Sequence, residues 1–447
     1  MDGLKAAGQP KERKSEYTVV HPKAPDAEHG LVDSEPAGST PKEQAPDHVT
    51  VAIARSFQEI GSLRAVWQMM QDEQPLPKPN ADIDRYCSVV EAIEGRVEPY
   101  VMLFRRDNQP VAMVIGRTED HRLSLKLGYQ SLFRPRLKCL NIVYGGILGQ
   151  MQGDLCSIII DELSRQLKSR QFDAVCFNYL NTDTAFYEAV RKKPGVLIRG
   201  HFPTISKHWR MSVPAKMDQF YESRSRRHRG SLRRAVRSFE RQYSSRDNFV
   251  RYTSEDEVDD FVRLAAGMSS KTYQYALGAG IVNDGQTISR LRTAAKHGWF
   301  HGSVLFAGGK PCAFQLGLRY KQVYYLVNLG YDPALNKYRV GTNLFLKVLE
   351  SLCEDPEIHS LDFYFGDAEY KKRYGTEHWS EACIYMFAPR IYPMAVNMVR
   401  CSVAGVNAGL AFVTKKIGGT DRIKRKWRDL LRNSARMSQT EAESGVT

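Results

Sequence analysis

Patterns that mark metal centres and several common hydrolases are missing from this sequence. Its eight cysteines form no C-x-x-C pair and do not group with the eleven histidines, so the spacing of zinc ligands is absent. G-x-S-x-G, a Walker A loop and H-E-x-x-H are absent as well. We therefore expect no bound metal and none of the chemistries that these motifs indicate.

Long apolar runs are also scarce. The longest covers residues 401–413, between Arg400 and Lys415, and is too short to cross a bilayer. No apolar segment of the secretory type follows the start of the chain, so we expect no secretory signal. The cysteines then fit buried, reduced thiols, and the sequence predicts a cytoplasmic protein.

Large apolar residues are almost missing from the first 47 residues, which hold six of the twenty prolines. Such a segment cannot offset its chain entropy, so it is predicted to be disordered. The remainder is long enough for two ordinary cores. We divide the chain into a disordered tail, a first domain, an arginine-rich linker helix, a second domain and a basic amphipathic C-terminal extension: residues 1–47, 48–213, 214–243, 244–390 and 391–447.

An internal repeat is the first positive signal. Residues 101–117 and 304–319 both read as strand, turn and strand, and both contain Pro-x-Ala-x-x-x-Gly, ending at Gly116 and Gly317. In each half a further strand, a helix (about 154–168 and 342–354) and another strand follow. The repeat predicts a duplicated βββαβ unit and an α+β fold, although hairpins with proline and glycine at fixed places also arise by chance.

The richest segment covers residues 323–375. Its strand VYYLVNLGYD and loop PALNKYRVG lead into a helix, so Gly341 lies where the loop turns helical, with Thr342 as the expected cap. A helix N-terminus favours a pyrophosphate, and Lys337 and Arg339 could add charge to it. The alternative is a plain turn glycine. The strand HSLDFYFG and the sequence GDAEYKKRYG follow.

Residues 217–375 resemble the CelD-like acetyltransferases, a branch of the GNAT superfamily related to the Fem peptidoglycan transferases. The resemblance implies two tandem GNAT folds with mixed, mostly antiparallel sheets, joined by a basic helix. It also implies acetyl-CoA or another acyl-CoA as co-substrate, bound near Lys337, Tyr338, Arg339, Gly341 and Thr342. The residues that carry it are Tyr331, Asp332, Tyr338, Gly341, Asp362, Gly366, Asp367, Tyr370, Lys371 and Gly375.

The sequence departs from the general GNAT pyrophosphate motif, Gln/Arg-x-x-Gly-x-Gly/Ala. Residues 336–341 read NKYRVG, so only the final glycine survives and Arg339 takes the middle position. An arginine there could crowd a pyrophosphate or pair with it. This leaves the identity of the acyl donor open.

The segment between the halves is strongly basic. Met217, Phe220, Leu232 and Phe239 belong to a helical apolar stripe, and Gly230 predicts a break or kink in the helix. The charged faces are either solvated or bind an anionic polymer, a nucleotide-sugar or tRNA. Eight arginines fill these faces: Arg224, Arg226, Arg227, Arg229, Arg233, Arg234, Arg237 and Arg241.

A second basic amphipathic segment lies near the C-terminus. Residues 421–433 place Ile423, Trp427, Leu430 and Leu431 on one stripe among basic residues. This predicts a helix that either docks on the domain or contacts the inner face of an anionic membrane peripherally.

The chemistry is predicted in the second half. Asp367 is the candidate base, Tyr370 or Tyr331 the proton donor, and Lys371 the group that holds an anionic part of a substrate. The structural alternative is that Asp367 caps the turn begun by Gly366 and that Lys371 is a surface charge.

The first half is predicted to be scaffold and one wall of the cleft. The glycines at 145, 146, 149 and 153 are more typical of turns than of a second phosphate site. His201 and His208 are interpreted as ordinary surface or core residues.

Three functions stay open at this point. The first is an N- or O-acyltransferase acting on a sugar or amine of a polysaccharide or cell-envelope precursor, as in exopolysaccharide biosynthesis. The second is a Fem-like transferase that uses aminoacyl-tRNA. The third is a non-catalytic basic adaptor with the same fold. The sequence specifies neither the acceptor nor the oligomeric state.

Overall fold

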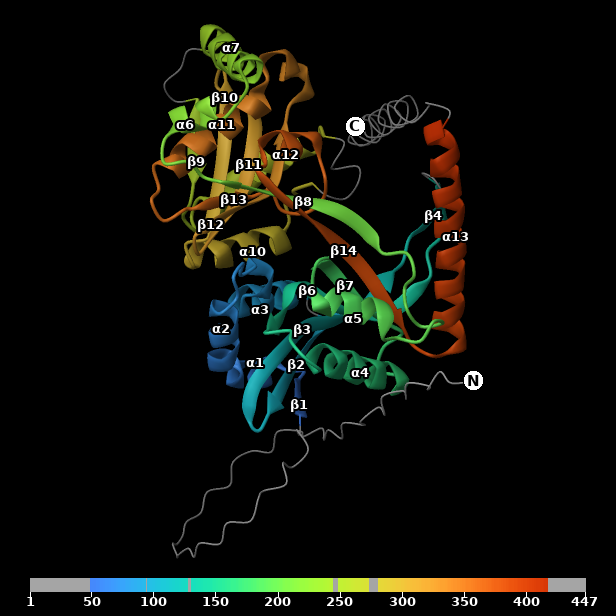
Figure 1. Ribbon diagram of the computed structural model, residues 1–447. Helices are drawn as coiled ribbons and strands as arrows, with labels where there is room; N and C mark the ends of the chain where they lie inside the picture. Colours follow the sequence, from blue (N-terminus) through green and yellow to red (C-terminus); the bar gives the residue numbers. More distant parts are fainter. Residues whose placement is uncertain (1–48, 94, 128–129, 244–247, 273–279, 417–447) are drawn as a thin grey trace, which may run out of the picture.

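A computed structural model describes residues 49–416, apart from 94, 128–129, 244–247 and 273–279. The predicted N-terminal tail and the helix expected at 421–433 lie outside the described residues. The two halves of the chain share one long sheet, with helices on both of its faces (Figure 1).

The first half begins with a strand and three helices and continues as a strand-rich unit. Its strands are β1 Val49–Ala54, β2 Val97–Arg106, β3 Gln109–Arg122, β4 Leu125–Leu127, β5 Gln130–Phe133, β6 Arg136–Gly149, β7 Ala174–Asn181 and β8 Thr204–Ser212. Its helices are α1 Phe57–Ser62, α2 Arg64–Asp72, the 3-10 helix η1 Pro79–Ala81, α3 Ile83–Ala92, α4 Leu155–Lys168 and α5 Ala185–Lys192.

The second half repeats this order after helices α6 and α7, of which α7 is strongly basic. Its strands are β9 Phe249–Tyr252, β10 Phe300–Ala307, β11 Lys310–Tyr320, β12 Val323–Tyr331, β13 Ser360–Asp362 and β14 Glu377–Phe387. Its helices are α6 Met217–Glu222, α7 Arg226–Gln242, α8 Val258–Ser269, α10 Gly285–Lys296, the 3-10 helix η2 Pro333–Tyr338, α11 Val340–Cys353, α12 Glu369–Tyr374 and α13 Ile391–Lys416.

The predicted duplication is present in the strand pairing. β2, β3, β6, α4 and β7 correspond in order to β10, β11, β12, α11 and β13, and each unit ends in one parallel pair, β6 with β7 and β12 with β13. The other strand pairs are antiparallel. The expected mixed, mostly antiparallel α+β architecture is therefore confirmed.

The two units are joined by an exchange of their last strands, which the sequence did not predict. The twelve strands run β1-β2-β3-β6-β7-β14-β8-β13-β12-β11-β10-β9. β14 of the second unit pairs with β7 of the first, and β8 of the first pairs with β13 of the second. Two separate sheets were expected, but the exchange fuses them into one.

Alternation along the strands supplies a core on each face of the sheet. Val101 and Leu103 of β2 pack against α1–α3, whereas Met102 and Phe104 pack under α4 and α5. The second half has the same arrangement, with α8 and α10 on one face and α6, α7 and α11 on the other. Successive strand residues point to opposite faces, so both faces of a covered sheet must be apolar.

The basic linker is helical, as predicted, but it breaks at a different place. The chain leaves the helix at 223–225, where the Ser225 side chain accepts from the His228 N–H and caps α7. Gly230 lies inside α7, so the expected break there is wrong. A serine cap satisfies an unpaired N–H, whereas one glycine costs a helix only about 1 kcal/mol. Leu232, Ala235 and Phe239 form the buried stripe of α7.

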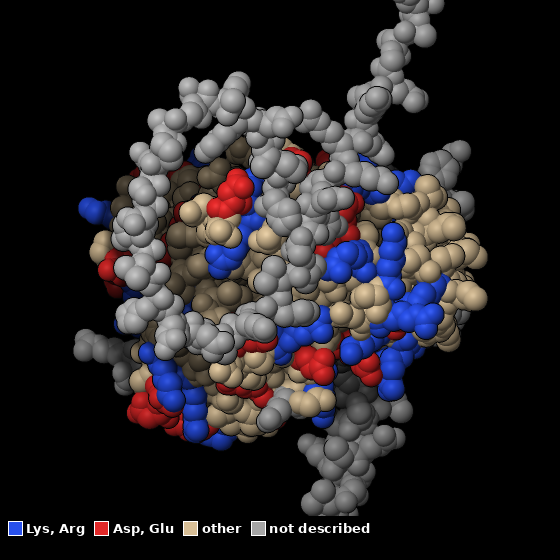
Figure 2. All heavy atoms as spheres, turned by 90° about the horizontal axis from the view of Figure 1, so that it is seen from below, with Lys and Arg blue, Asp and Glu red and all other residues tan. Residues whose placement is uncertain are grey.

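The cysteines are all free, and half of them are fully buried: Cys139, Cys156, Cys176 and Cys312. The other four are partly exposed, so the expectation of buried thiols holds only in part. Over the described residues, no helix is long and apolar enough to span a bilayer. Seen from the first-half end, Lys and Arg side chains are interspersed with Asp and Glu (Figure 2).

Residues 71–82 of the first half dock directly on the second half. The Gln71 side-chain amide donates to the Tyr320 hydroxyl at 2.8 Å, and this hydroxyl donates to Asp82 at 2.9 Å. The Tyr325 hydroxyl donates to the Pro77 carbonyl at 2.8 Å. This segment therefore brings Lys78 to the end of β13, beside Tyr325 of β12.

Candidate functional site

The site is organised by the divergence of β12 and β13. Their parallel pairing covers three residue pairs and ends at Tyr325 and Asp362. The chain then turns at Tyr364, whose φ is 57°. Because left-handed backbone is costly for a tyrosine, the surrounding contacts must hold it. The expected strand HSLDFYFG is thus only three residues long, and Asp362, not Asp367, stands at its end.

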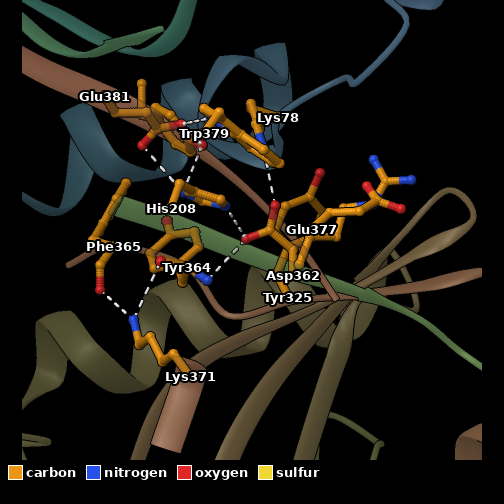
Figure 3. Close-up of polar contacts among 12 residues, drawn as sticks. Lys78, His208, Tyr325, Asp362, Tyr364, Phe365, Lys371, Glu377, Trp379 and Glu381 are labelled. Carbon is orange, nitrogen blue, oxygen red and sulfur yellow. Dashed lines mark hydrogen bonds and ion pairs between the residues drawn. The ribbon is translucent and has the colours of Figure 1, made fainter. Parts of the chain in front are cut away.

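A buried cluster of charged groups fills this divergence (Figure 3). Asp362 is fully buried and accepts from Lys78 Nζ at 3.0 Å and from the Tyr364 N–H at 2.8 Å. Its other partner is His208 on β8, whose Nε2 lies 2.7 Å from Oδ1. His208 Nδ1 lies 3.1 Å from Glu381 on β14.

The outer oxygen of Glu381 is also occupied. It accepts from the Tyr144 hydroxyl of β6 and from Trp379 Nε1, each at 2.9 Å. The cluster thus joins β6, β8, β13, β14 and the segment before η1. It depends on the strand exchange, because β8 and β14 cross between the units.

The charges of the cluster balance when His208 is protonated. Burial alone would raise the pKa of Asp362, but Lys78 and His208 hold it well below its ordinary value. Burial alone would lower the pKa of His208, but hydrogen bonds to Asp362 and Glu381 outweigh burial and raise it. Two cations, Lys78 and His208, therefore face two carboxylates inside the protein, which is the condition under which buried charges are tolerated.

Lys371 lies next to this cluster and is the predicted site residue with the most unusual environment. Its side chain is buried, and Nζ donates to the Tyr364 carbonyl at 3.2 Å and to the Phe365 carbonyl. Burial lowers the pKa of Lys371 to about 8, against the opposing influence of Asp362, Asp367 and Glu381. The alternative of a surface charge is therefore wrong, since the amine is enclosed.

Tyr370 lies next to Lys371 on α12, and Asp367 lies just before this helix. Asp367 is exposed, and its Oδ1 accepts from Trp209 Nε1 at 2.9 Å. Asp367 was expected directly at the end of the strand. Instead, Phe363 to Gly366 form a turn between Asp362 and Asp367. Tyr370 is partly buried against Phe363. Tyr331 is not part of this group; it ends β12 and packs against α11.

The predicted phosphate seat lies at the start of α11. Arg339 precedes the helix in left-handed conformation, and α11 begins at Val340 without a side-chain cap. Thr342 lies inside the first turn, so its assignment as the cap is wrong. A Cβ on Gly341 would come within 3.1 Å of the Tyr331 ring, so close packing accounts for this glycine.

Cationic groups surround this helix start. Arg339 Nη1 donates to the Ser231 carbonyl and hydroxyl of α7 at 3.0 and 2.8 Å, so the arginine is directed toward α7. Arg224 donates to the carbonyl of Arg373 at 3.4 Å. His228 lies among Arg224, Arg339 and Arg373, which together with burial lower its pKa.

The other predicted residues of this seat are Lys337 and Tyr338. Lys337 is exposed, and its Nζ lies 4.8 Å from the Tyr338 ring centroid. Tyr338 packs edge-on against Tyr243 at the end of α7. An anion at this place would meet both the helix dipole and several positive side chains.

The corresponding place in the first half is built differently. Asp154 precedes α4, and its carboxylate pairs with Arg106 at 2.6 Å. A Cβ on Gly149 would come within 2.3 Å of the Val111 carbonyl, so close packing between strands requires this glycine. A carboxylate at the helix start disfavours a phosphate. Gly145, Gly146 and Gly149 lie within β6, so the interpretation as turn glycines is wrong for these three and holds only for Gly153.

Comparison with known families identifies one domain in the second half. Residues 226–372 match a family model described as an acetyltransferase (GNAT) domain. The second half is a GNAT-type acyltransferase domain. The match covers about a third of the chain. It includes the start of α11, the end of β13 and Lys371. For a domain of this kind an acyl-CoA is the general co-substrate.

Similar folds occur in several solved structures. FemX is 9% identical over 72% of this chain and 96% of that chain, with a TM-score of 0.49. A tandem GNAT protein from the clavulanic acid biosynthesis pathway is 8% identical, with coverages of 77% and 99% and a TM-score of 0.44. The C-terminal domain of a putative lysylphosphatidylglycerol synthetase from Agrobacterium fabrum is 9% identical, with coverages of 77% and 97% and a TM-score of 0.45.

Sequence identities this low say nothing about the function of the chain. A search of curated proteins found no significant match. The expected α+β fold with a repeated unit is confirmed by the strand pairing, and the GNAT domain match covers the second unit. The CelD-like subfamily is not confirmed by these comparisons.

Sequence reasoning missed most of the buried cluster. Lys78, Trp379 and Glu381 were not considered, and His208 was interpreted as ordinary. Asp362 was noted only as part of the resemblance. Alternation along TISKHWRMS gave no signal for His208, because it places the histidine on the face of Ser206 and Arg210, opposite to buried Trp209 and Met211.

Proposed function

We propose that the protein transfers an acyl group from an acyl-CoA to an amine or hydroxyl of a polysaccharide or cell-envelope precursor, as a CelD-like acetyltransferase would. One observation carries this proposal. Lys371, a buried lysine with a pKa lowered to about 8, stands beside exposed Asp367 where β12 and β13 diverge, inside the segment that matches the GNAT domain. Strongly perturbed side chains of this kind concentrate at functional sites.

The start of α11 fits the phosphate groups of such a donor. The helix dipole favours an anion there, and Arg224, Arg339 and Arg373 place positive charge around His228 beside the helix start. Nε2 of His228 has no hydrogen-bond partner among the described residues. Exposed Lys337, with Tyr338, Gly341 and Thr342, completes the predicted donor-binding set. Acyl-CoA would supply the acyl group there as a thioester.

Two side chains divide the proton transfers. Asp367, held by Trp209, accepts the proton of the attacking amine or hydroxyl. Lys371 donates a proton to the departing thiolate. Its pKa of about 8 lies close to the ordinary value of about 8.5 for a thiol, so this proton transfer is nearly balanced. Tyr370 and Tyr331 remain alternative proton donors.

A specific observation favours the second candidate, an aminoacyl-tRNA-dependent transferase. α7 presents exposed arginines along one side and packs beside the start of α11, so a polyanion on α7 would reach the donor seat. The exposed members are Arg226, Arg227, Arg233, Arg234, Arg237 and Arg241. Phosphate contacts of this kind dominate nucleic-acid affinity and weaken with salt. A non-catalytic adaptor would use the same surface without a donor site.

Titration calorimetry with acetyl-CoA distinguishes these functions. The acyltransferase binds acetyl-CoA, and salt-sensitive retention on tRNA without acetyl-CoA binding would favour the second candidate or the adaptor. Turnover is then measured as thiol release in the presence of a panel of amino sugars. Release that does not respond to any acceptor, together with absent acetyl-CoA binding, would contradict the proposal.

Lys371→Met tests the role of the lysine, with Lys372→Met as the matched control. Lys372 is the exposed neighbour on the same helix, so its loss removes a charge but no buried amine. We expect Lys371→Met to lower turnover about a hundredfold or more, and Lys372→Met to leave it unchanged. In the wild type, turnover should fall as pH rises through about 8, because Lys371 loses its proton there. Equal turnover of the two variants would contradict the assignment.

A further inference from the structure

Exposed apolar side chains gather on one flank of the molecule. Of the fifteen large apolar residues that are exposed in the described part of the chain, eleven belong to three elements that touch one another. They are Leu127 and Phe133 of the β4–β5 hairpin, Val196, Leu197, Phe202 and Ile205 of the segment before and into β8, and Ile391, Tyr392, Met398, Val399 and Val406 of α13. Scattered exposed apolar residues are ordinary, but their concentration on one surface marks an interaction site.

Hydrogen bonds hold these three elements together as one surface, called here the apolar edge. Asn397 of α13 donates to the carbonyls of Leu197 and Arg199, each at 3.0 Å. Arg400 donates to the Phe202 carbonyl at 2.6 Å. The Tyr392 hydroxyl donates to the Arg136 carbonyl at 2.9 Å, and α13 also packs against β4. Figure 1 shows α13 along the flank of the first half, beside β4.

α13 has two distinct faces. Its buried residues Pro393, Val396, Asn397 and Arg400 face the protein. Its exposed residues follow positions i, i+1, i+7, i+8 and i+15 from Ile391, which places them within roughly 120° of arc at 3.6 residues per turn. Ile391 is 89% exposed and Met398 is 57% exposed. The helix therefore presents a continuous apolar stripe to its surroundings.

The charged residues around this apolar stripe indicate which kind of partner binds it. Between Ile391 and Val413 the only charged residue is Arg400, which is directed inward. Exposed Arg134 and Arg136 follow the hairpin, and residues 415–447 carry nine basic against four acidic residues. An apolar stripe bordered by basic residues matches the boundary between anionic headgroups and acyl chains.

We propose that the apolar edge lies on the surface of an anionic phospholipid bilayer, with α13 parallel to the membrane plane. α13 lies on the bilayer and does not cross it, because it is not apolar enough to span. The segment after α13 adds attraction to the headgroups. The inference is independent of the proposed chemistry, since the apolar edge contains none of the residues proposed for catalysis or donor binding.

The test is co-sedimentation of the full chain with vesicles of phosphatidylcholine alone and of equimolar phosphatidylcholine and phosphatidylglycerol. The wild type should bind the anionic vesicles, and about 1 M salt should weaken this binding. The double variant Met398→Glu/Val406→Glu should lower the partition coefficient about tenfold or more, because both charges enter the apolar stripe that the bilayer would bury. Val282→Glu, an exposed apolar position outside the apolar edge, should bind like the wild type.

Three outcomes would overturn the proposal. The first is no binding of the wild type to anionic vesicles. The second is a concentration-dependent dimer that the double variant abolishes while vesicle binding persists, which would make the apolar edge a contact between two copies. The third is unchanged binding of the double variant with complete loss on removal of residues 417–447, which would assign binding to the basic segment alone.

Discussion

The ion pair between Lys78 and Asp362 should contribute much more to stability than another pair that joins the two halves. Lys78→Met leaves the Asp362 carboxylate buried with one cation fewer. Removal of one partner from a buried pair costs about 3–5 kcal/mol. We expect about 3 kcal/mol, because His208 and the Tyr364 N–H remain as partners.

Lys321→Met is the matched control. Lys321 also pairs across the halves, with Asp72 at 2.5 Å, but these side chains are 35% and 71% exposed. Such a pair contributes about 0–1 kcal/mol. In urea unfolding, the midpoint of Lys78→Met should fall by about 1 M at a slope of about 3 kcal/mol/M, and that of Lys321→Met by a third of this or less.

The pH dependence separates charge from packing. The pKa of Asp362 is lowered in the folded state, so its contribution is present above the unfolded value of about 3.9 and is lost as pH falls through the folded value. The difference in the free energy of unfolding between wild type and Lys78→Met should therefore shrink below about pH 4. The reasoning would be refuted if the two lysine variants lost equal free energies of unfolding, or if the loss in Lys78→Met did not change with pH.

Further predictions concern the same network, the basic helix and the exchanged strands. The raised pKa of His208 makes its stabilisation complete below about pH 6.5 and lost as pH rises through the folded value; His208→Gln should flatten this part of a stability-against-pH curve. Replacement of Arg226, Arg229 and Arg233 by glutamine should weaken retention on tRNA or another polyanion at low salt and leave the melting temperature unchanged; a lowered melting temperature with equal retention would make them structural. Residues 214–416 expressed alone should show no cooperative unfolding by circular dichroism, because β13 loses β8 and β14 loses β7.

Local patterns in the sequence were sufficient to predict most elements and the repeated order. β12 and α11 were expected close to their observed bounds, because β-branched and aromatic residues mark the strand and helical spacing of leucines marks the helix. Lys371 was also expected in the site. What went wrong there was the length of β13: the Asp362 carboxylate accepts from the Tyr364 N–H and ends the strand, and no local pattern reveals that contact.

The buried cluster was not predictable from local patterns, because its members come from five distant segments. Lys78 and Asp362 are 284 residues apart, and His208 and Glu381 are 173 apart. A single histidine or glutamate in an alternating strand has the same local signature whether it faces water or a buried partner. Only the order of strands in the sheet decides this, and the exchange of β8 and β14 was not visible in the sequence.

The exchange also explains how the first half can affect chemistry in the second. Lys78 neutralises Asp362, Asp362 fixes the Tyr364 N–H, and the strained turn at Tyr364 directs two carbonyls at Lys371. Each step is a contact between neighbours, and the first crosses from one half to the other. A single second half would retain the turn residues but lose the cation and the histidine that hold the carboxylate. The first half therefore contributes Lys78 and His208 to the electrostatics of the site, and this gives a physical reason for keeping both copies of the fold in one chain.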